Sequence, residues 1–173
     1  MKKLRNKLLS ILIVLIFCMT VTSSNAYSNQ PYGWKTTYIP IRDATSSQYT
    51  QIVKKSINAW NNSVPGVKFY FDKNAPNTIY SGNYKDSWIG YYSFYTRRGK
   101  TYKFNIYLNN RLLSKRSSNY KQSTLVHELG HALSLADNPS NSNSIMRYDR
   151  NRNIMITPTA DDIAGVKKYY GLK

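Results

Sequence analysis

The chain has 173 residues, and its 25 lysines and arginines against 8 acidic residues give a formal net charge of +17. This length suits one domain with a substantial core, and the charge favours an anionic neighbour or serves solubility alone. A specific nucleic-acid partner is not expected, because no recognition-helix, RNP or zinc-finger pattern accompanies the charge.

Residues 1–26 have the pattern of a secretory signal peptide. Four basic residues precede an apolar run over about residues 8–21, and residues 24–26 offer a small-x-small cleavage site. A membrane anchor is the alternative, but the apolar run is shorter than the roughly 20 residues that a spanning helix needs. We therefore expect a secreted, extracellular protein without a stable membrane anchor.

The expected mature chain, residues 27–173, contains no cysteine, because Cys18 leaves with the signal peptide. Cys18 could instead mark a lipoprotein, but Phe17 before it is too bulky for the usual lipoprotein signal. Disulfides and thiolate chemistry are therefore not expected. The mature chain keeps 21 basic and 8 acidic residues, a net charge of +13, and we expect a single, monomeric domain.

The secondary-structure pattern predicts an α+β fold. A short strand is expected over Lys35–Ile41, and residues 46–62 carry apolar side chains at helical spacing. Four strand-like runs follow at residues 67–71, 77–84, 88–96 and 102–108, and then two helices at 119–135 and 159–170. This order predicts a mixed, twisted five-stranded sheet with two long helices and a C-terminal helix packed on it.

The second long helix contains H-E-x-x-H, formed by His127, Glu128 and His131. Four helical residues turn the chain through about 400°, so the two imidazoles lie one above the other and can bind one ion. Zinc prefers such nitrogen ligands and tetrahedral geometry. The pattern can occur by chance, but these are the only histidines and the only glutamate of the chain.

A catalytic zinc site needs a third protein ligand, which here has to be an aspartate. Asp137 lies six residues beyond His131, so the helix must end before it and the chain must fold back. Asn138 precedes a proline and is therefore pushed out of the helical conformation, which supports that ending. A more distant aspartate, such as Asp149 or Asp161, is the alternative.

His127, Glu128, His131 and Asp137 together resemble the extended motif H-E-x-x-H-x-x-G-x-x-H of the metzincin metalloproteases, with aspartate as third ligand as in the snapalysin family. Residues 144–148 (S-I-M-R-Y) resemble the metzincin Met-turn, whose methionine, here Met146, would form a hydrophobic floor beneath the metal. Residues 159–171 are similar to the last helix of matrixins.

The resemblance implies a metzincin-like zincin domain and a secreted zinc endopeptidase that acts on peptides or proteins. Zinc would polarise the scissile carbonyl, and Glu128 would be the general base. An extended substrate would pair with an edge strand, which we expect within residues 88–96. Tyr148 stands where astacins and serralysins carry a tyrosine that binds zinc or stabilises the oxyanion, although it could be an ordinary turn residue.

Ser134 departs from the family pattern, which has glycine at the tight turn after the helix. A non-glycine residue with positive φ there would cost on the order of 1 kcal/mol.

An alternative function is a secreted, basic binding protein for an anionic polymer or cell surface, with a non-catalytic zinc site. It is supported by the +13 charge and by the many tyrosines between residues 80 and 107. Half-exposed strands favour tyrosine in any case, so a structural role for these rings is the simpler interpretation.

Overall fold

The computed structural model describes residues 27–138 and 143–173. The expected signal peptide, residues 1–26, lies outside the described residues. Within the described part of the chain, no helix has both the length and the apolar character needed to cross a membrane.

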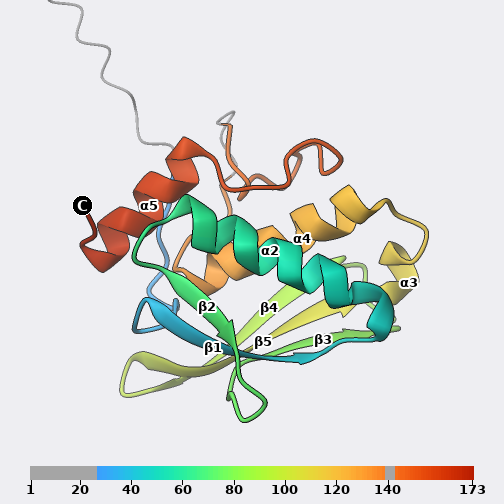
Figure 1. Cartoon of the computed structure of the whole chain (residues 1–173), viewed down its shortest axis with the longest axis horizontal. Helices are drawn as coiled ribbons and strands as arrows, with labels where there is room; N and C mark the ends of the chain where they lie inside the picture. Colours follow the sequence, from blue (N-terminus) through green and yellow to red (C-terminus); the bar gives the residue numbers. More distant parts are fainter. Residues whose placement is uncertain (1–26, 139–142) are drawn as a thin grey trace, which may run out of the picture.

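A five-stranded sheet forms one layer and helices form the other (Figure 1). The elements in chain order are β1 (Tyr38–Ala44), η1 (Ser47–Tyr49), α2 (Thr50–Ser63), β2 (Lys68–Phe71), β3 (Thr78–Gly82), β4 (Gly90–Arg97), β5 (Lys100–Asn109), α3 (Asn110–Leu113), α4 (Ser118–Ala132) and α5 (Ala160–Tyr170). Helices α2 and α4 lie side by side over one face of the sheet, and α5 lies at one end of this helical layer (Figure 1).

The strand order in the sheet is β2-β1-β3-β5-β4. Strand β1 pairs in parallel with β2 and β3, β3 pairs in parallel with β5, and only β4 and β5 are antiparallel. The expected mixed five-stranded sheet is therefore confirmed. Strand β4 lies at the edge of the sheet, as expected for residues 88–96.

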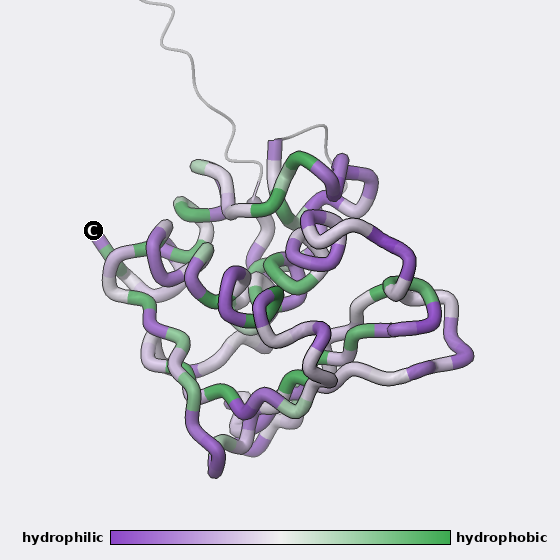
Figure 2. The backbone as a smooth tube through the Cα atoms, turned by 45° about the vertical axis from the view of Figure 1, so that its right-hand side comes forward, coloured by the Kyte–Doolittle hydropathy of each residue, from purple (hydrophilic) through white to green (hydrophobic). Residues whose placement is uncertain are grey.

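The core lies between the sheet and the two long helices. In β5, Phe104, Ile106 and Leu108 alternate along the strand and are fully buried, as the period of two in a strand requires. Trp60 of α2 is also fully buried, and its indole Nε1 donates a hydrogen bond of 2.8 Å to the carbonyl of Val126 in α4. Hydrophilic residues predominate at loops and hairpin tips (Figure 2).

The first strand is displaced from its expected position at residues 35–41 and runs from Tyr38 to Ala44. Its apolar first half pairs with β2, but its second half, residues 42–44, pairs with β3. That second half is exposed and partly polar, so hydrophobic alternation does not mark it as a strand.

The β4–β5 hairpin is longer than expected, because its turn contains only Arg98 and Gly99. Both residues have positive φ, 51° and 72°. A two-residue loop with two positive φ angles matches the right-handed twist of the strands, but Arg-Gly lacks the usual asparagine or aspartate signal.

Candidate metal centre and cleft

Helix α4 carries His127, Glu128 and His131 on its inner side. The helix begins after Ser117, whose hydroxyl caps it by accepting a hydrogen bond of 3.1 Å from the Tyr120 amide. His127 and Glu128 are buried, and the imidazole of His131 is largely covered. A long helix that packs on the core therefore holds all three side chains in fixed positions.

The helix ends at Ala132, three residues earlier than expected, and Ser134 adopts φ of 72°. The Ser134 hydroxyl donates a hydrogen bond to the carbonyl of Gln30, and the Gln30 amide donates to the Ser134 carbonyl at 2.8 Å. Gly33 makes room for this contact, since a Cβ there would lie 2.5 Å from the Ser134 Cβ. The serine therefore ties the N-terminal segment to the end of α4, which glycine could not do through a side chain.

The turn at Ser134 brings Asp137 back to the two histidines. Its Oδ1 lies 3.1 Å from Nε2 of His127 and 3.7 Å from Nε2 of His131. One ligand atom from each of the three residues lies within 4.8 Å of the others. Asp149, one of the two alternatives, instead forms an ion pair with Arg147 at 2.8 Å.

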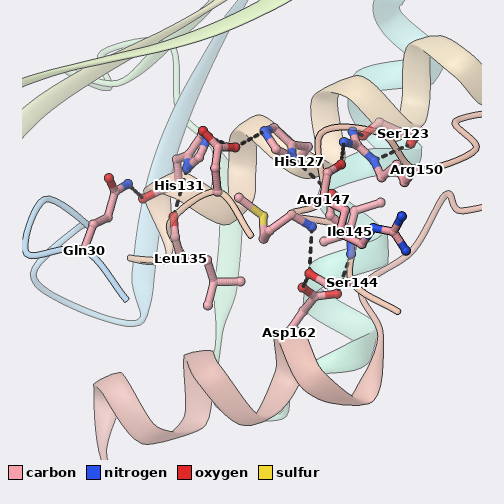
Figure 3. A network of polar contacts seen from close by, with 12 residues as sticks. Gln30, Ser123, His127, His131, Leu135, Ser144, Ile145, Arg147, Arg150 and Asp162 are labelled. Atoms are coloured by element: carbon pink, nitrogen blue, oxygen red, sulfur yellow. Dashed lines mark hydrogen bonds and ion pairs between the residues drawn. The ribbon is translucent and has the colours of Figure 1, made fainter. Parts of the chain in front are cut away.

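Both imidazoles direct their Nδ1 atoms at backbone carbonyls (Figure 3). Nδ1 of His127 lies 3.0 Å from the Ile145 carbonyl, and Nδ1 of His131 lies 2.8 Å from the Leu135 carbonyl. A carbonyl only accepts, so each Nδ1 carries the proton and each neutral ring presents the Nε2 lone pair to Asp137. Burial lowers the pKa of His127 to about 4 and also lowers that of His131, so both rings are neutral at pH 7.

These donor atoms fit a zinc ion. Ligand atoms at 2.0–2.1 Å from a tetrahedral zinc lie about 3.3 Å from one another, close to the two separations between Asp137 and the histidines. The neighbouring His127 and His131 lower the pKa of Asp137 against the effect of burial, so a carboxylate is present. The side chain of Asp137 is 65% exposed, which leaves the cluster open on one side.

Glu128 lies beside this cluster and is 6% exposed. Burial, together with the negative charge of Asp137, raises its pKa to about 8, against the opposing charges of Arg150 and Arg152. Gly90, the first residue of β4, packs against the carboxylate, since a Cβ at Gly90 would lie 2.5 Å from Glu128 Oε1. The close approach of the edge strand thus sets the position of the carboxylate.

Residues 144–148, which resemble a Met-turn, are anchored on α5 and contact His127 through a backbone carbonyl. Asp162 of α5 is fully buried, and its carboxylate accepts hydrogen bonds from the Ser144 hydroxyl at 2.5 Å and the Ile145 amide at 2.9 Å. Ile145 in turn offers its carbonyl to His127 (Figure 3). Met146 is buried, and its Sδ occupies the space that a side chain at Gly130 would need.

A cleft of about 430 Å³ passes over the cluster. One wall comes from β4 and the loop before it, and the other from α4. Beyond the cluster, the cleft is lined by Gln30 and Tyr92, which contact His131, and by Phe94, Tyr148, Arg150 and Arg152. Tyr148 is 77% exposed, and its ring centre lies 5.7 Å from the guanidinium carbon of Arg152.

The structure therefore brings together His127, Glu128, His131 and Asp137, with Tyr148 on the wall of the cleft and Met146 packed against Gly130 of α4. Gly90, Arg150, Arg152 and Asp162 also contact or line the site, and no motif in the sequence indicates this. The two arginines follow the S-I-M-R-Y segment directly, and this proximity was the only available signal for them. Gly90 and Asp162 act through contacts across the fold, which leave no local pattern.

No protein-family model matches the sequence, and no curated protein sequence matches it either. The fold is similar to that of myroilysin, with a TM-score of 0.58 and 13% identity over 85% of this chain and 99% of that one. It also matches high choriolytic enzyme 1, a hatching-enzyme zinc-protease from the medaka fish Oryzias latipes, with a TM-score of 0.47 and 17% identity over 90% and 99% of the two chains. The expected metzincin-type α+β fold is thereby confirmed.

Proposed function

We propose that the protein is a zinc-dependent endopeptidase in which His127, His131 and Asp137 bind the metal. The observation that carries this proposal is the convergence of two Nε2 atoms and one carboxylate oxygen within 4.8 Å, beside a buried glutamate in an open cleft. The metzincin-type fold supports the proposal, because its helix α4 presents two of the three proposed zinc ligands to the open cleft.

A zinc ion, when bound, would act as a Lewis acid that polarises the scissile carbonyl and makes the attacking water more acidic. Glu128 would take the proton of that water and then pass it to the departing amine. Its surroundings suit this role, because burial and the negative charge of Asp137 raise its pKa and so make the carboxylate a stronger proton acceptor than an exposed glutamate. The backbone carbonyls of Ile145 and Leu135 would keep both imidazoles in the tautomer that leaves Nε2 free to bind.

The substrate would lie extended along β4. This strand pairs only with β5 within the described sheet, so its other side offers backbone groups along the cleft. An extended peptide could add to that edge as a further strand, which gives affinity through main-chain hydrogen bonds. Tyr148, at the rim, would stabilise the oxyanion or bind the metal.

Metal removal tests the proposal. Purified protein should contain about one zinc per chain and hydrolyse casein. Treatment with a chelator should abolish hydrolysis, and zinc should restore it. Zinc-loaded protein that folds correctly but cleaves neither casein nor unfolded peptides would contradict an enzymatic role and favour the alternative of a binding protein for an anionic polymer or cell surface.

We further propose that the mature protein is a secreted, monomeric domain that begins near Tyr27. This residue packs on α5, where Lys168 Nζ lies 5.5 Å from the centre of its ring, and Asn29 donates to the Gly165 carbonyl at 3.3 Å. The folded unit therefore uses the chain from this point onward. Intact-mass measurement of secreted protein would identify the first residue, and a retained, lipid-modified Cys18 would contradict the proposal.

A further inference from the structure

Three segments without acidic residues meet at one end of the molecule. They are residues 27–42, residues 90–109 and residues 163–173, and they contain two, four and three basic residues respectively. The segment before β1, the tip of the β4–β5 hairpin and the C-terminal end of α5 lie together at the left of Figure 1. With no negative side chain among them, these segments give this end a positive electrostatic potential.

Direct contacts fasten the three segments to one another. Trp34 and Thr101 form a β-bridge between the segment before β1 and β5, and the Thr101 hydroxyl donates to the Tyr32 carbonyl at 3.0 Å. The Tyr170 hydroxyl of α5 donates to the Trp34 carbonyl at 2.7 Å. The Trp34 ring is buried and packs edge-on against Phe104 of the core. The backbone at this end is therefore held in a fixed arrangement.

A second cavity, of about 330 Å³, lies where the segments meet. Lys35 and Thr36 line it from the first segment, Lys100 from the hairpin and Tyr169 from α5. Both lysines are exposed, and none of the described residues that line the cavity is acidic. The cavity wall thus combines two ammonium groups with hydroxyl groups, a set that suits an anion.

Two arginines extend the positive charge beyond this cavity. Arg98 forms the tip of the hairpin together with Gly99, which lines the cavity, and Arg97 pairs with Lys100 across the hairpin. Both arginines are exposed. Within the described part of the chain, no acidic side chain forms an ion pair with any member of this basic cluster, which we define as Lys35, Arg97, Arg98 and Lys100.

The basic cluster fits a linear polymer with repeating phosphate groups. One small anion would neutralise only part of four charges that surround a cavity, whereas a polymer brings a negative group to each. The ammonium group of lysine is a compact point charge that binds phosphate well, and the guanidinium of arginine binds phosphate through parallel hydrogen bonds.

Nucleic acids and membranes fit the basic cluster less well. A single nucleic-acid strand gains affinity from bases that stack on aromatic rings. Tyr169 is the one aromatic side chain that the described residues place on the cavity, and its ring packs against Tyr170 with centres 4.9 Å apart. A membrane-binding tip carries apolar side chains that enter the bilayer, but this tip consists of Arg98 and Gly99.

The basic cluster lies beside the cleft of the candidate metal centre but does not line it. Gln30 and Phe94 line the cleft, whereas Pro31 and Gly33 line the second cavity. Between them, the ring of Tyr32 stacks on that of Phe94 with centres 4.3 Å apart. A polymer on the cluster would therefore lie next to the cleft and leave it open to peptides.

We propose that the basic cluster binds a polyol phosphate polymer of a cell surface and holds the protein there. The binding is electrostatic between exposed groups, so added salt should weaken it. It needs neither a metal ion nor hydrolysis, and it therefore stands or falls independently of the proposed function.

Fluorescence anisotropy of labelled poly(glycerol phosphate), titrated with the purified secreted protein, tests the proposal. Each cationic side chain near a polyanionic surface contributes roughly fivefold to affinity. The double variant Lys35→Gln, Lys100→Gln should therefore bind about 30-fold more weakly than the wild type. The double variant Lys54→Gln, Lys55→Gln removes the same charge from exposed positions on α2 and should bind like the wild type. Both variants should keep the wild-type melting temperature, because all four lysines are exposed.

Single-stranded DNA and vesicles of phosphatidylglycerol, at the same phosphate concentration, are the comparison ligands. Weaker binding of both than of poly(glycerol phosphate) would support the proposal, and stronger binding of either would overturn it. Loss of affinity that is equal in the two double variants would also overturn it, because the effect would then depend on net charge alone. Peptide hydrolysis is measured separately, and Lys35→Gln, Lys100→Gln should keep the wild-type kcat/KM because neither residue lines the cleft.

Discussion

Asp137 occupies the position that completes the candidate metal site, although it is the most exposed of the three residues in the cluster. Its Oδ1 faces the Nε2 atoms of both histidines, at 3.1 Å and 3.7 Å. Asp149, twelve residues further on, is exposed and is neutralised by Arg147. These two aspartates therefore offer a matched pair of substitutions.

Asp137→Ala should strip or severely weaken zinc binding, because one of three protein ligands is lost. The loss of affinity should exceed the roughly 10- to 100-fold that removal of a residue supporting a ligand costs. Asp149→Ala should retain zinc with wild-type affinity. Titration with a competing chelator measures both, and equal retention of zinc in the two variants would exclude Asp137 from the site.

Tyr148 can act in catalysis through its hydroxyl or in packing through its ring. Removal of the hydroxyl distinguishes these two roles. If the hydroxyl contacts the oxyanion or the metal in the transition state, Tyr148→Phe should lower kcat by about 10²- to 10³-fold with little change in KM. The ring remains, so its contact with Arg152 and the melting temperature should be preserved. Steady-state kinetics with a melting curve decide between the roles. Near-wild-type turnover in Tyr148→Phe would leave only a packing role for the ring.

Ser134 shows why a departure from a family pattern can be structural. Its positive φ is unfavourable for a residue with a Cβ, on the order of 1 kcal/mol, and the sequence offers no reason for it. The reason is a partner more than 100 positions away, the carbonyl of Gln30, together with the space left by Gly33. Local sequence cannot supply such a partner.

Among the elements, β4 and α4 must approach each other closely for the candidate site to form. Gly90 of β4 contacts the side chains of Thr124 and Glu128 in α4, and an added Cβ would lie 2.8 Å from Thr124 Cγ2. The Glu128 carboxylate is the flexible end of a side chain, so it can move away from such a group.

Gly90→Ala should therefore reduce activity more than stability. Displacement of Glu128 should lower kcat by about 10²-fold, the cost typical of a misplacement near 1 Å. Zinc should remain bound, because the atoms nearest to an added Cβ belong to Glu128 and Thr124 and not to the three proposed ligands. Gly82→Ala, whose nearest neighbours are atoms of the Tyr84 ring, is the control and should retain activity. Parallel assays of turnover, zinc content and unfolding check this, and unchanged kcat in Gly90→Ala would show that the contact does not position the glutamate.

The elements that sequence could predict are those with strong local patterns. The spacing of His127 and His131 and the apolar stripe beside them predict α4, and alternation predicts the apolar half of β1. The exposed half of β1 is a strand only because β3 lies beside it. The end of α4 at Ala132 likewise depends on Ser134 and its distant partner, so the expected end at residue 135 was wrong.

At the scale of the whole molecule, the ligand spacing predicts the cluster but not the cleft. The order of strands and helices predicts a mixed sheet with helices packed on it, and the fold confirms this. The cleft walls come from segments that are remote in sequence: residue 30, the start of β4 and the loop at residues 148–152. Their meeting depends on packing across the molecule, so Gly90 gains its contact with Glu128 only in the folded chain.

We propose that Glu128 acts as a base beside a zinc ion that other residues bind. Glu128→Gln tests it most directly, because the amide keeps the size of the side chain but cannot take a proton from water. Metal analysis and peptide hydrolysis are to be measured on the same preparation. This role predicts that the variant has about one zinc per chain, an unchanged melting temperature and no detectable hydrolysis. Hydrolysis at the wild-type rate, or loss of zinc together with activity, would contradict it.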